Sequence, residues 1–194
     1  MELYLIRHGK TKGNLEGRYV GSTDEGILQD SIEDLKFKTL PEVDLLYVSP
    51  MKRCLETCQL LYPGMDYEII TDFKEMDFGI FEYKNYHELN GNPIYQQWID
   101  SYCELKLMEG ESKREFQRRC VGAFKTILQK ARKEGKKKIA FVVHGGTIMS
   151  ILDAYSYPHK DYFHWNIENG NGYLGKCEEK DEGIVIGALH RIFD

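Results

Sequence analysis

Apolar residues along the chain form short runs that alternate with stretches of helical periodicity. The runs that predict strands lie at residues 3–6, 43–49, 67–71 and 138–144. Apolar spacing predicts helices at about 31–37, 50–61, 94–101, 112–134 and 147–155. Two final strands are expected near 173–177 and 184–189, on either side of a polar turn at 178–183. Strands that alternate with helices are typical of an α/β protein with a mostly parallel sheet.

Capping signals locate the starts of two helices. Ser49 is the predicted N-cap of the second helix and Pro50 its first helical residue, a position that suits proline. Ser112 followed by Glu115 has the spacing of a capping box and opens the longest helix. Gly145–Gly146 is expected to be a turn between the last parallel strand and its helix.

Three of the predicted strands end in basic or hydroxyl side chains and then turn into a helix. These endings are Arg7–His8–Gly9, Ser49–Pro50 with Arg53 one turn further on, and His144–Gly145–Gly146. If the strands are parallel neighbours, the three endings converge at one edge of the sheet, where open α/β sheets bind their ligands. Two arginines and two histidines at one place predict a binding site for an oxyanion such as phosphate.

The converging side chains also permit phosphoryl transfer. A neutral imidazole nitrogen is a competent nucleophile toward phosphorus, which makes His8 the candidate nucleophile. Arg7, Arg53 and a protonated His144 would stabilise the charge that develops on the phosphoryl oxygens.

An alkoxide leaving group also needs a proton, which a carboxylic acid can supply. Glu75, Asp77 and Glu82 follow the third strand and are candidates, although by composition each is equally compatible with a solvated surface carboxylate. The sequence has neither a phosphate-binding G-x-x-x-x-G-K-[ST] loop nor an acidic cluster with metal-ligand spacing. We therefore expect no metal and no cofactor.

Composition narrows the class of partner. The 194 residues suit one domain, and a net charge of −5 gives no electrostatic basis for binding nucleic acid or an anionic membrane. No apolar run approaches 18 residues and no signal peptide is evident, which predicts a cytoplasmic protein. The odd number of cysteines favours reduced thiols over disulfides or zinc; they are Cys54, Cys58, Cys103, Cys120 and Cys177. The oligomeric state is left open.

Several motifs occur together, in order, between residue 3 and about residue 175. They are Arg7–His8–Gly9 with Thr11 and Asn14; Ser49–Pro50, Arg53 and Glu56–Thr57; Glu75, Phe78–Gly79 and Glu82; Gly110–Glu111–Ser112 with Phe116 and Arg119; and His144–Gly145–Gly146. This set resembles the histidine phosphatase superfamily, the phosphoglycerate-mutase-like group.

The resemblance implies a three-layer α/β/α sandwich with a mostly parallel central sheet, formed as one domain over residues 1–194 with a lid-like insertion at about 75–112. It implies that His8 carries the phosphoryl group and that Glu75 donates the proton. It further implies a phosphate and substrate site made by Arg7, Asn14, Ser22, Thr23, Arg53, His144 and Gly145.

The sequence departs from the family pattern at a few positions. Lys10 stands where Glu or Gln is usual, Glu109 replaces a frequent Gly, and Phe81 replaces a common Trp. The usual Leu-Thr-x-x-Gly before the first long helix reads Leu28–Gln–Asp–Ser31, which makes that helix hard to place. None of these departures touches the proposed catalytic residues.

The short chain is most similar to the α-ribazole phosphatase and broad-specificity phosphatase branch. The predicted activity is that of a phosphomonoesterase on a small phosphate ester, with α-ribazole 5′-phosphate as the first candidate substrate. Between residues 83 and 108 the strong cations are Lys84 and Lys106, with His87 as a third candidate, too few to retain a bisphosphate. The alternatives are a cofactor-dependent phosphoglycerate mutase and a non-catalytic protein that binds a phosphorylated ligand. Aromatic residues in the same segment could line a substrate pocket or form the core of the lid.

Overall fold

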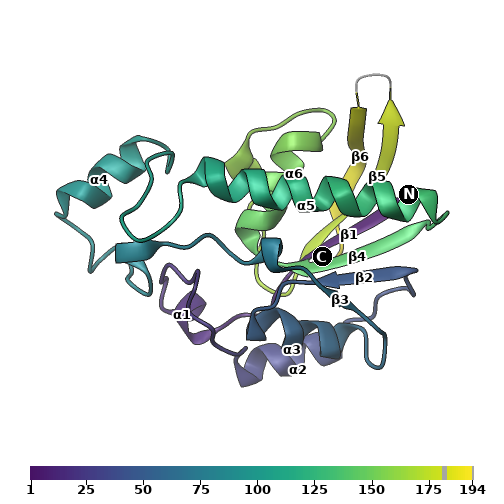
Figure 1. The fold of residues 1–194 in the computed structure, drawn as a ribbon. Coiled ribbons are helices and arrows are strands. Elements are labelled where there is room, and N and C mark those ends of the chain that lie inside the picture. The colour runs from purple at the N-terminus through teal and green to yellow at the C-terminus, as the bar shows by residue number, and fades with distance from the viewer. Residues whose placement is uncertain (181–182, 194) are drawn as a thin grey trace.

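A six-stranded mixed sheet forms the centre of the computed structural model, which describes residues 1–180 and 183–193 (Figure 1). The strands are β1 (Glu2–Arg7), β2 (Leu45–Val48), β3 (Glu68–Ile69), β4 (Lys138–Val143), β5 (Gly172–Lys180) and β6 (Gly183–Arg191). Their spatial order is β3-β2-β4-β1-β5-β6. The first four are parallel, whereas β5 pairs antiparallel with β1 and β6 pairs antiparallel with β5. The prediction of a mostly parallel sheet is confirmed.

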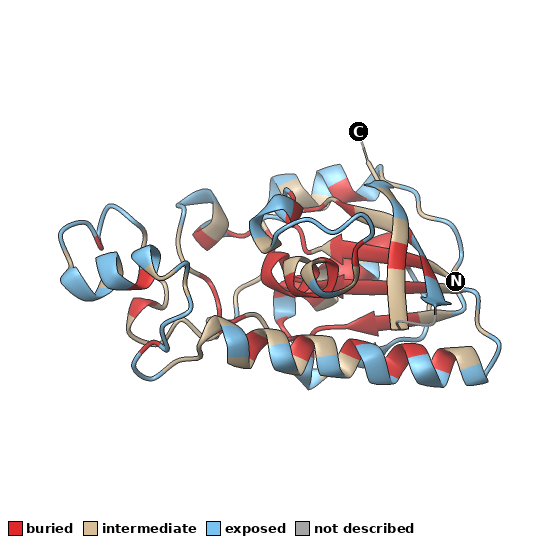
Figure 2. Ribbon diagram, turned by 90° about the horizontal axis from the view of Figure 1, so that it is seen from above, coloured by how far each residue is buried: buried red, intermediate tan, exposed pale blue. Residues whose placement is uncertain are grey.

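Helices cover both faces of this sheet, which gives the three expected layers (Figures 1 and 2). The helices are α1 (Lys12–Leu15), α2 (Gln29–Lys36), α3 (Lys52–Leu61), α4 (Pro93–Asp100), α5 (Lys113–Lys133) and α6 (Gly145–Tyr155). Because side chains alternate along a strand, Leu3 and Leu5 face the core under α5 and α6, while Tyr4 and Ile6 face the core under α2 and α3. Within the described chain, no helix combines the length and apolarity needed to cross a membrane.

The segment between β3 and α5 extends away from the sheet and carries α4 at its far end (Figure 1). It contains the 3₁₀ turns η1 (Thr71–Phe73) and η2 (Gly79–Phe81); a third, η3 (Tyr162–Trp165), follows α6. Figure 2 shows that α4 is largely exposed. A separate small core holds the segment against the first turns of α5, and it consists of Met76, Phe81, Leu89, Trp98, Leu107, Phe116 and Cys120.

Several predicted boundaries are correct and others are wrong. The Ser112 capping box is present, with Glu115 accepting from the Ser112 backbone N–H. The prediction that Ser49 caps the second helix is wrong: α3 begins at Lys52 with Met51 as its N-cap, and the Ser49 hydroxyl bonds elsewhere.

Two predicted turns also differ from the structure. Gly145 and Gly146 form the first turn of α6 instead of a separate turn. Within the turn predicted at 178–183, residues 178–180 belong to β5 and Gly183 begins β6; residues 181–182 lie outside the described residues.

Candidate active site

The carboxyl ends of β1, β4 and β2 bring together the side chains that were predicted to meet. β4 lies between β1 and β2, so Arg7, His144 and Ser49 lie at the ends of three adjacent strands. The His8 and His144 rings are 5.2 Å apart between centroids and meet edge to face. The prediction that the three strand endings converge is confirmed.

His8 is held in one tautomer. Its ring is 3% exposed, and Nδ1 lies 2.7 Å from the Gly9 carbonyl oxygen. Since a carbonyl only accepts, Nδ1 carries the proton and Nε2 keeps its lone pair in the neutral ring. Burial lowers the pKa of His8 well below its usual value, and the cations Arg53 and Arg7 lower it further. The imidazole is therefore neutral and nucleophilic at Nε2.

His144 has a similar electrostatic environment and a different hydrogen-bond pattern. Its Nε2 lies 2.7 Å from the Ser49 hydroxyl oxygen, and Arg53 Nε donates toward its Nδ1 at 3.4 Å. Burial lowers the pKa of His144 well below its usual value, with Arg53 and His8 as further causes. Before any anion binds, His144 is therefore neutral. A bound dianionic phosphate would favour its protonated form.

Two guanidinium groups, that of Arg53 buried and that of Arg7 half-buried, provide positive charge at the site. Arg53 is 0% exposed and donates to the Thr23 carbonyl oxygen at 2.8 Å and the Gly21 carbonyl oxygen at 3.0 Å. Arg7 donates from Nη1 to the Ile167 carbonyl oxygen at 2.5 Å. The buried Arg7 Nε has no hydrogen-bond partner among the described groups. Because a buried charged donor strongly favours an acceptor, this atom suits an anionic ligand.

The turn after His8 depends on a contact that the sequence did not reveal. The Gly9 N–H donates to Thr57 Oγ1 at 2.8 Å, and that hydroxyl donates to the Arg53 carbonyl oxygen at 2.7 Å. A Cβ on Gly9 would lie 2.7 Å from Ser31 Oγ and 2.9 Å from Leu35 Cδ1, so a larger residue here would displace these side chains of α2. Thr57 lay within a recognised motif, but nothing in that motif indicated a bond across 48 residues.

Glu75 lies at the N-terminus of α6. Its Oε2 accepts from the Gly146 N–H at 3.1 Å, and its Oε1 accepts from the Met76 N–H at 2.9 Å. A Cβ on Gly146 would lie 2.3 Å from the Glu75 carboxylate, so glycine is required for this approach. The residue that Glu75 contacts, Gly146, directly follows Gly145, which lies against the Arg7 guanidinium.

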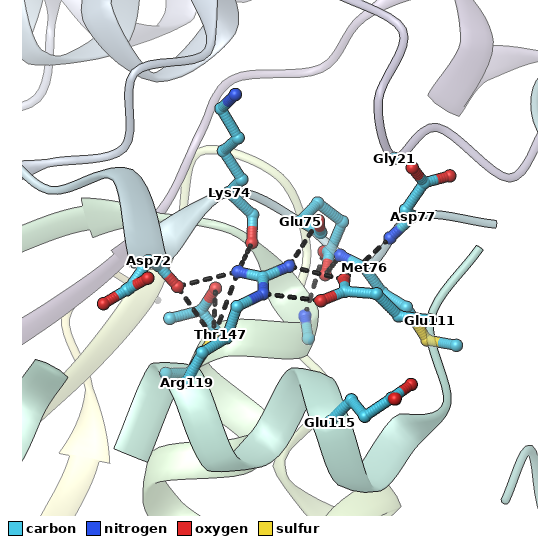
Figure 3. Close-up of polar contacts among 12 residues, drawn as sticks. Gly21, Asp72, Lys74, Glu75, Met76, Asp77, Glu111, Glu115, Arg119 and Thr147 are labelled. Atoms are coloured by element: carbon cyan, nitrogen blue, oxygen red, sulfur yellow. Dashed lines mark hydrogen bonds and ion pairs between the residues drawn. The ribbon is translucent and has the colours of Figure 1, made fainter. Parts of the chain in front are cut away.

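A clamp formed by Arg119 and Glu111 holds the loop that carries Glu75 (Figure 3). The Arg119 guanidinium donates to the carbonyl oxygens of Asp72 and Lys74 at 2.7 Å each and of Glu75 at 3.0 Å. It also binds Glu111 through two contacts of 2.8 and 2.6 Å. The motif identified both residues, but their role as a brace for the loop is visible only in the structure.

The other two carboxylate candidates hold backbone groups. Glu82 Oε1 accepts from the N–H groups of Gly21 and Thr23, both at 2.9 Å, which shapes the loop on the far side of Arg53. Asp77 Oδ1 accepts from the Gly79 N–H at 2.9 Å. Glu75 also accepts from backbone N–H groups, but one of them lies in the first turn of α6 next to Gly145 and Arg7, which makes Glu75 the candidate acid beside the predicted phosphate site.

The remaining predicted substrate residues border the same region. Asn14 Oδ1 accepts from Asn169 Nδ2 at 3.0 Å, and Asn169 also donates to the His8 carbonyl oxygen at 3.3 Å. Ser22 lines a depression beside Glu75, whereas Thr23 contributes its carbonyl oxygen to Arg53. Asn169 was not singled out from the sequence.

A cavity of about 200 Å³ opens beside Glu75 and Gly146. Its lining is mostly apolar and aromatic and includes Tyr19, Met76, Phe78, Trp98, Met149, Tyr162 and Phe163. The small core includes Trp98, as expected if the aromatic residues of this segment pack together, and Trp98 also lines the cavity, so its part in a substrate pocket stays a prediction. Tyr86 and Tyr102 are exposed, and they neither belong to the small core nor line this cavity. Such a cavity suits the apolar part of a small ligand.

Among residues 1–180 and 183–193, no group of three His, Cys, Asp or Glu side chains is placed to hold a metal ion. The five cysteines are free. The positive charge of the site comes instead from guanidinium groups.

An α/β sandwich with two histidines and two arginines at the carboxyl ends of its parallel strands is suited to binding a phosphate ester. The family model for the histidine phosphatase superfamily, branch 1, matches residues 3–189. The chain belongs to this superfamily, and the family prediction is confirmed.

Two relatives with assigned names match most of the chain. The adenosylcobalamin/α-ribazole phosphatase of Salmonella typhimurium is 28% identical, over 88% of this chain and 87% of its own. A Hydrogenobacter thermophilus protein with the provisional name phosphoserine phosphatase 2 is 25% identical, over 98% and 95%. The crystal structure of the α-ribazole phosphatase from Shigella flexneri matches the fold with a TM-score of 0.80 at 22% identity, over 96% of this chain and 94% of that one.

Proposed function

We propose that the protein is a metal-independent phosphomonoesterase that forms a phosphohistidine on His8. The supporting observation is the His8 tautomer: Nδ1 donates to the Gly9 carbonyl, which leaves a lone pair on Nε2 of a ring close enough to Arg53 and Arg7 for both cations to lower its pKa. Nε2 attacks phosphorus while Arg7, Arg53 and His144 stabilise charge on the equatorial oxygens. Water then hydrolyses the phosphohistidine and releases phosphate.

Glu75 is the proposed general acid. It donates a proton to the leaving-group oxygen and then takes one from the attacking water. Its contact with the Gly146 N–H fixes the carboxyl group at the edge of the phosphate site. In this proposal the chain is one phosphatase domain over 1–194, and residues 75–112 form a lid that covers the leaving group.

The first candidate substrate is α-ribazole 5′-phosphate. The aromatic cavity beside Glu75 has the size and apolar lining for a planar ring system, and two of the reported relatives are named for this activity. We expect hydrolysis to dominate over phosphoglycerate mutase activity, because the lid segment carries few cations for a second phosphate.

Acid-labile labelling tests the mechanism. The wild type, incubated briefly with ³²P-labelled substrate and quenched in base, should yield a labelled protein that loses its phosphate in acid. His8→Ala should not label, whereas the exposed control His87→Ala should label as the wild type does. Wild-type labelling of His8→Ala would show that another group is the nucleophile.

A substrate series tests the specificity. Phosphate release should be fastest from α-ribazole 5′-phosphate among a set that includes O-phosphoserine and 3-phosphoglycerate. Efficient conversion of 3-phosphoglycerate to 2-phosphoglycerate with little phosphate release would instead indicate a mutase.

A further inference from the structure

The aromatic cavity contains one cation among the described residues that line it, Lys113. Lys113 is the first residue of α5, directly after the Ser112 N-cap. It lies outside the 83–108 segment, where the sequence was searched for cations. An ammonium group in an apolar wall affects which leaving groups the cavity accepts.

The charge of Lys113 is already partnered. Its Nζ lies 2.8 Å from Glu104 Oε1 and donates to the Tyr102 carbonyl oxygen at 3.3 Å. The same atom lies 5.0 Å from the ring centre of Tyr162 and 5.5 Å from that of Phe163. The Lys113 side chain is 12% exposed and that of Glu104 is 46% exposed.

These contacts determine how the cavity receives a charged group. An ammonium has three N–H donors, and two of those of Lys113 point to Glu104 and Tyr102. An anionic substituent in the cavity would lose its hydration, face aromatic walls and be repelled by the Glu104 carboxylate. An uncharged aromatic group would bury apolar area without either penalty.

We propose that the Lys113–Glu104 ion pair is a specificity-determining pair that admits uncharged aromatic leaving groups to the cavity and rejects anionic ones. This inference rests on the proposed phosphomonoesterase function and names its class of leaving group. Glu104 lies outside the cavity lining and acts through Lys113. Removal of the Glu104 charge should therefore convert Lys113 into an open site for an anion.

Two isosteric aryl phosphates isolate the effect of charge. 4-Carbamoylphenyl phosphate and 4-carboxyphenyl phosphate have nearly the same shape, and only the second has a negatively charged substituent on its ring. The measured quantity is the ratio of their kcat/KM values in each variant. The variants are Glu104→Gln, Lys113→Met and the double substitution.

Glu179→Gln is the matched control. Glu179 is an exposed carboxylate that pairs at 2.7 Å with Arg132, a largely buried cation on the other half of the same helix. This variant removes an equivalent charge far from the cavity. Circular dichroism and thermal melts verify that each variant is folded.

The wild type should prefer the carbamoyl ester by about tenfold or more, the ratio expected for burying an unpaired charged group. Glu104→Gln should reduce this preference about tenfold, chiefly through a lower KM for the carboxy ester. Addition of Lys113→Met should restore the preference, and Glu179→Gln should leave the ratio at the wild-type value.

Three outcomes would overturn the inference. In the first, the wild type uses the carboxy ester as well as the carbamoyl ester, which would make Lys113 an open anion site. In the second, Glu104→Gln leaves the ratio unchanged. In the third, the gain in Glu104→Gln persists after Lys113→Met. Absence of hydrolysis of either ester and of p-nitrophenyl phosphate by the folded wild type would be a different result, because it would refute the proposed function itself.

Discussion

Replacement of Arg119 by methionine tests whether the clamp positions Glu75, the proposed general acid. The guanidinium makes five hydrogen bonds to oxygen atoms, three to the carbonyl oxygens of Asp72, Lys74 and Glu75 and two to Glu111. Methionine keeps much of the apolar stem and removes all five. Arg119 also holds the Glu111 carboxylate, which accepts from the Asp77 N–H. Loss of Arg119 therefore weakens the contacts of the loop on both sides of Glu75.

The expected loss of stability follows from this count. Charge-assisted hydrogen bonds contribute about 1.5–3 kcal/mol each when buried. The Arg119 and Glu111 side chains are 22% and 24% exposed, so water replaces part of the lost bonding. We expect the free energy of unfolding to fall by about 2–4 kcal/mol. For a chain of this length that corresponds to a decrease in Tm of about 5–12 °C.

The expected loss of activity depends on the leaving group. A misplacement of about 1 Å in a catalytic group can cost about 10²-fold in rate. An alkyl phosphate needs the proton from Glu75, so its kcat should fall about 10–10²-fold in Arg119→Met. p-Nitrophenyl phosphate releases a stable phenolate, so its kcat should change by less than about threefold.

Steady-state kinetics of both esters at 25 °C, where the variant remains folded, provide the measurement. Arg118→Met is the control, because Arg118 is exposed on the same helix one residue earlier. Arg119→Lys should recover part of the activity on the alkyl ester. Equal losses on both esters would show that Arg119 supports the fold or the phosphate site instead of the acid, and so would refute the reasoning.

Three further predictions address the proposed chemistry. Glu75→Gln should lose about 10²–10⁴-fold on the alkyl ester and much less on p-nitrophenyl phosphate; a uniform loss would contradict its role as an acid. Excess EDTA should leave activity unchanged, and a loss that Mg²⁺ restores would contradict the metal-free mechanism. In the folded state His8 and His144 stay neutral at pH values just below 6.5, their ordinary pKa, because their pKa values are lowered. In the unfolded chain the same two side chains bind protons in that pH range. The free energy of unfolding should therefore decrease as pH falls through about 6.5, and it should decrease less in the double variant His8→Gln/His144→Gln. Urea melts at pH 7.5 and pH 5.5 measure both decreases, and equal decreases in the two proteins would contradict the prediction.

Local patterns in the sequence were sufficient to predict the sheet, most helices and the convergence of the strand endings. Apolar runs determine the strands, and Arg7–His8 and His144 directly follow two of them. Parallel strands place their carboxyl ends on one edge, so the location of the site followed from the order of elements. The Ser112 capping box was equally predictable, because its two partners are three residues apart.

The tertiary structure alone decided how the functional side chains are held. Thr57 bonds the Gly9 backbone, Ser49 bonds His144 across 95 residues, and the Arg119 clamp spans from α5 to the loop that carries Glu75. The Lys113–Glu104 pair likewise depends on how the segment after α4 folds back onto α5. Such contacts leave no periodic signal in the sequence, because their geometry depends on loops whose paths are set by packing against the rest of the chain. The chain's residue pattern therefore predicts where an anion would bind, and in the proposed function the packed loops determine which proton donor and which leaving group would meet it there.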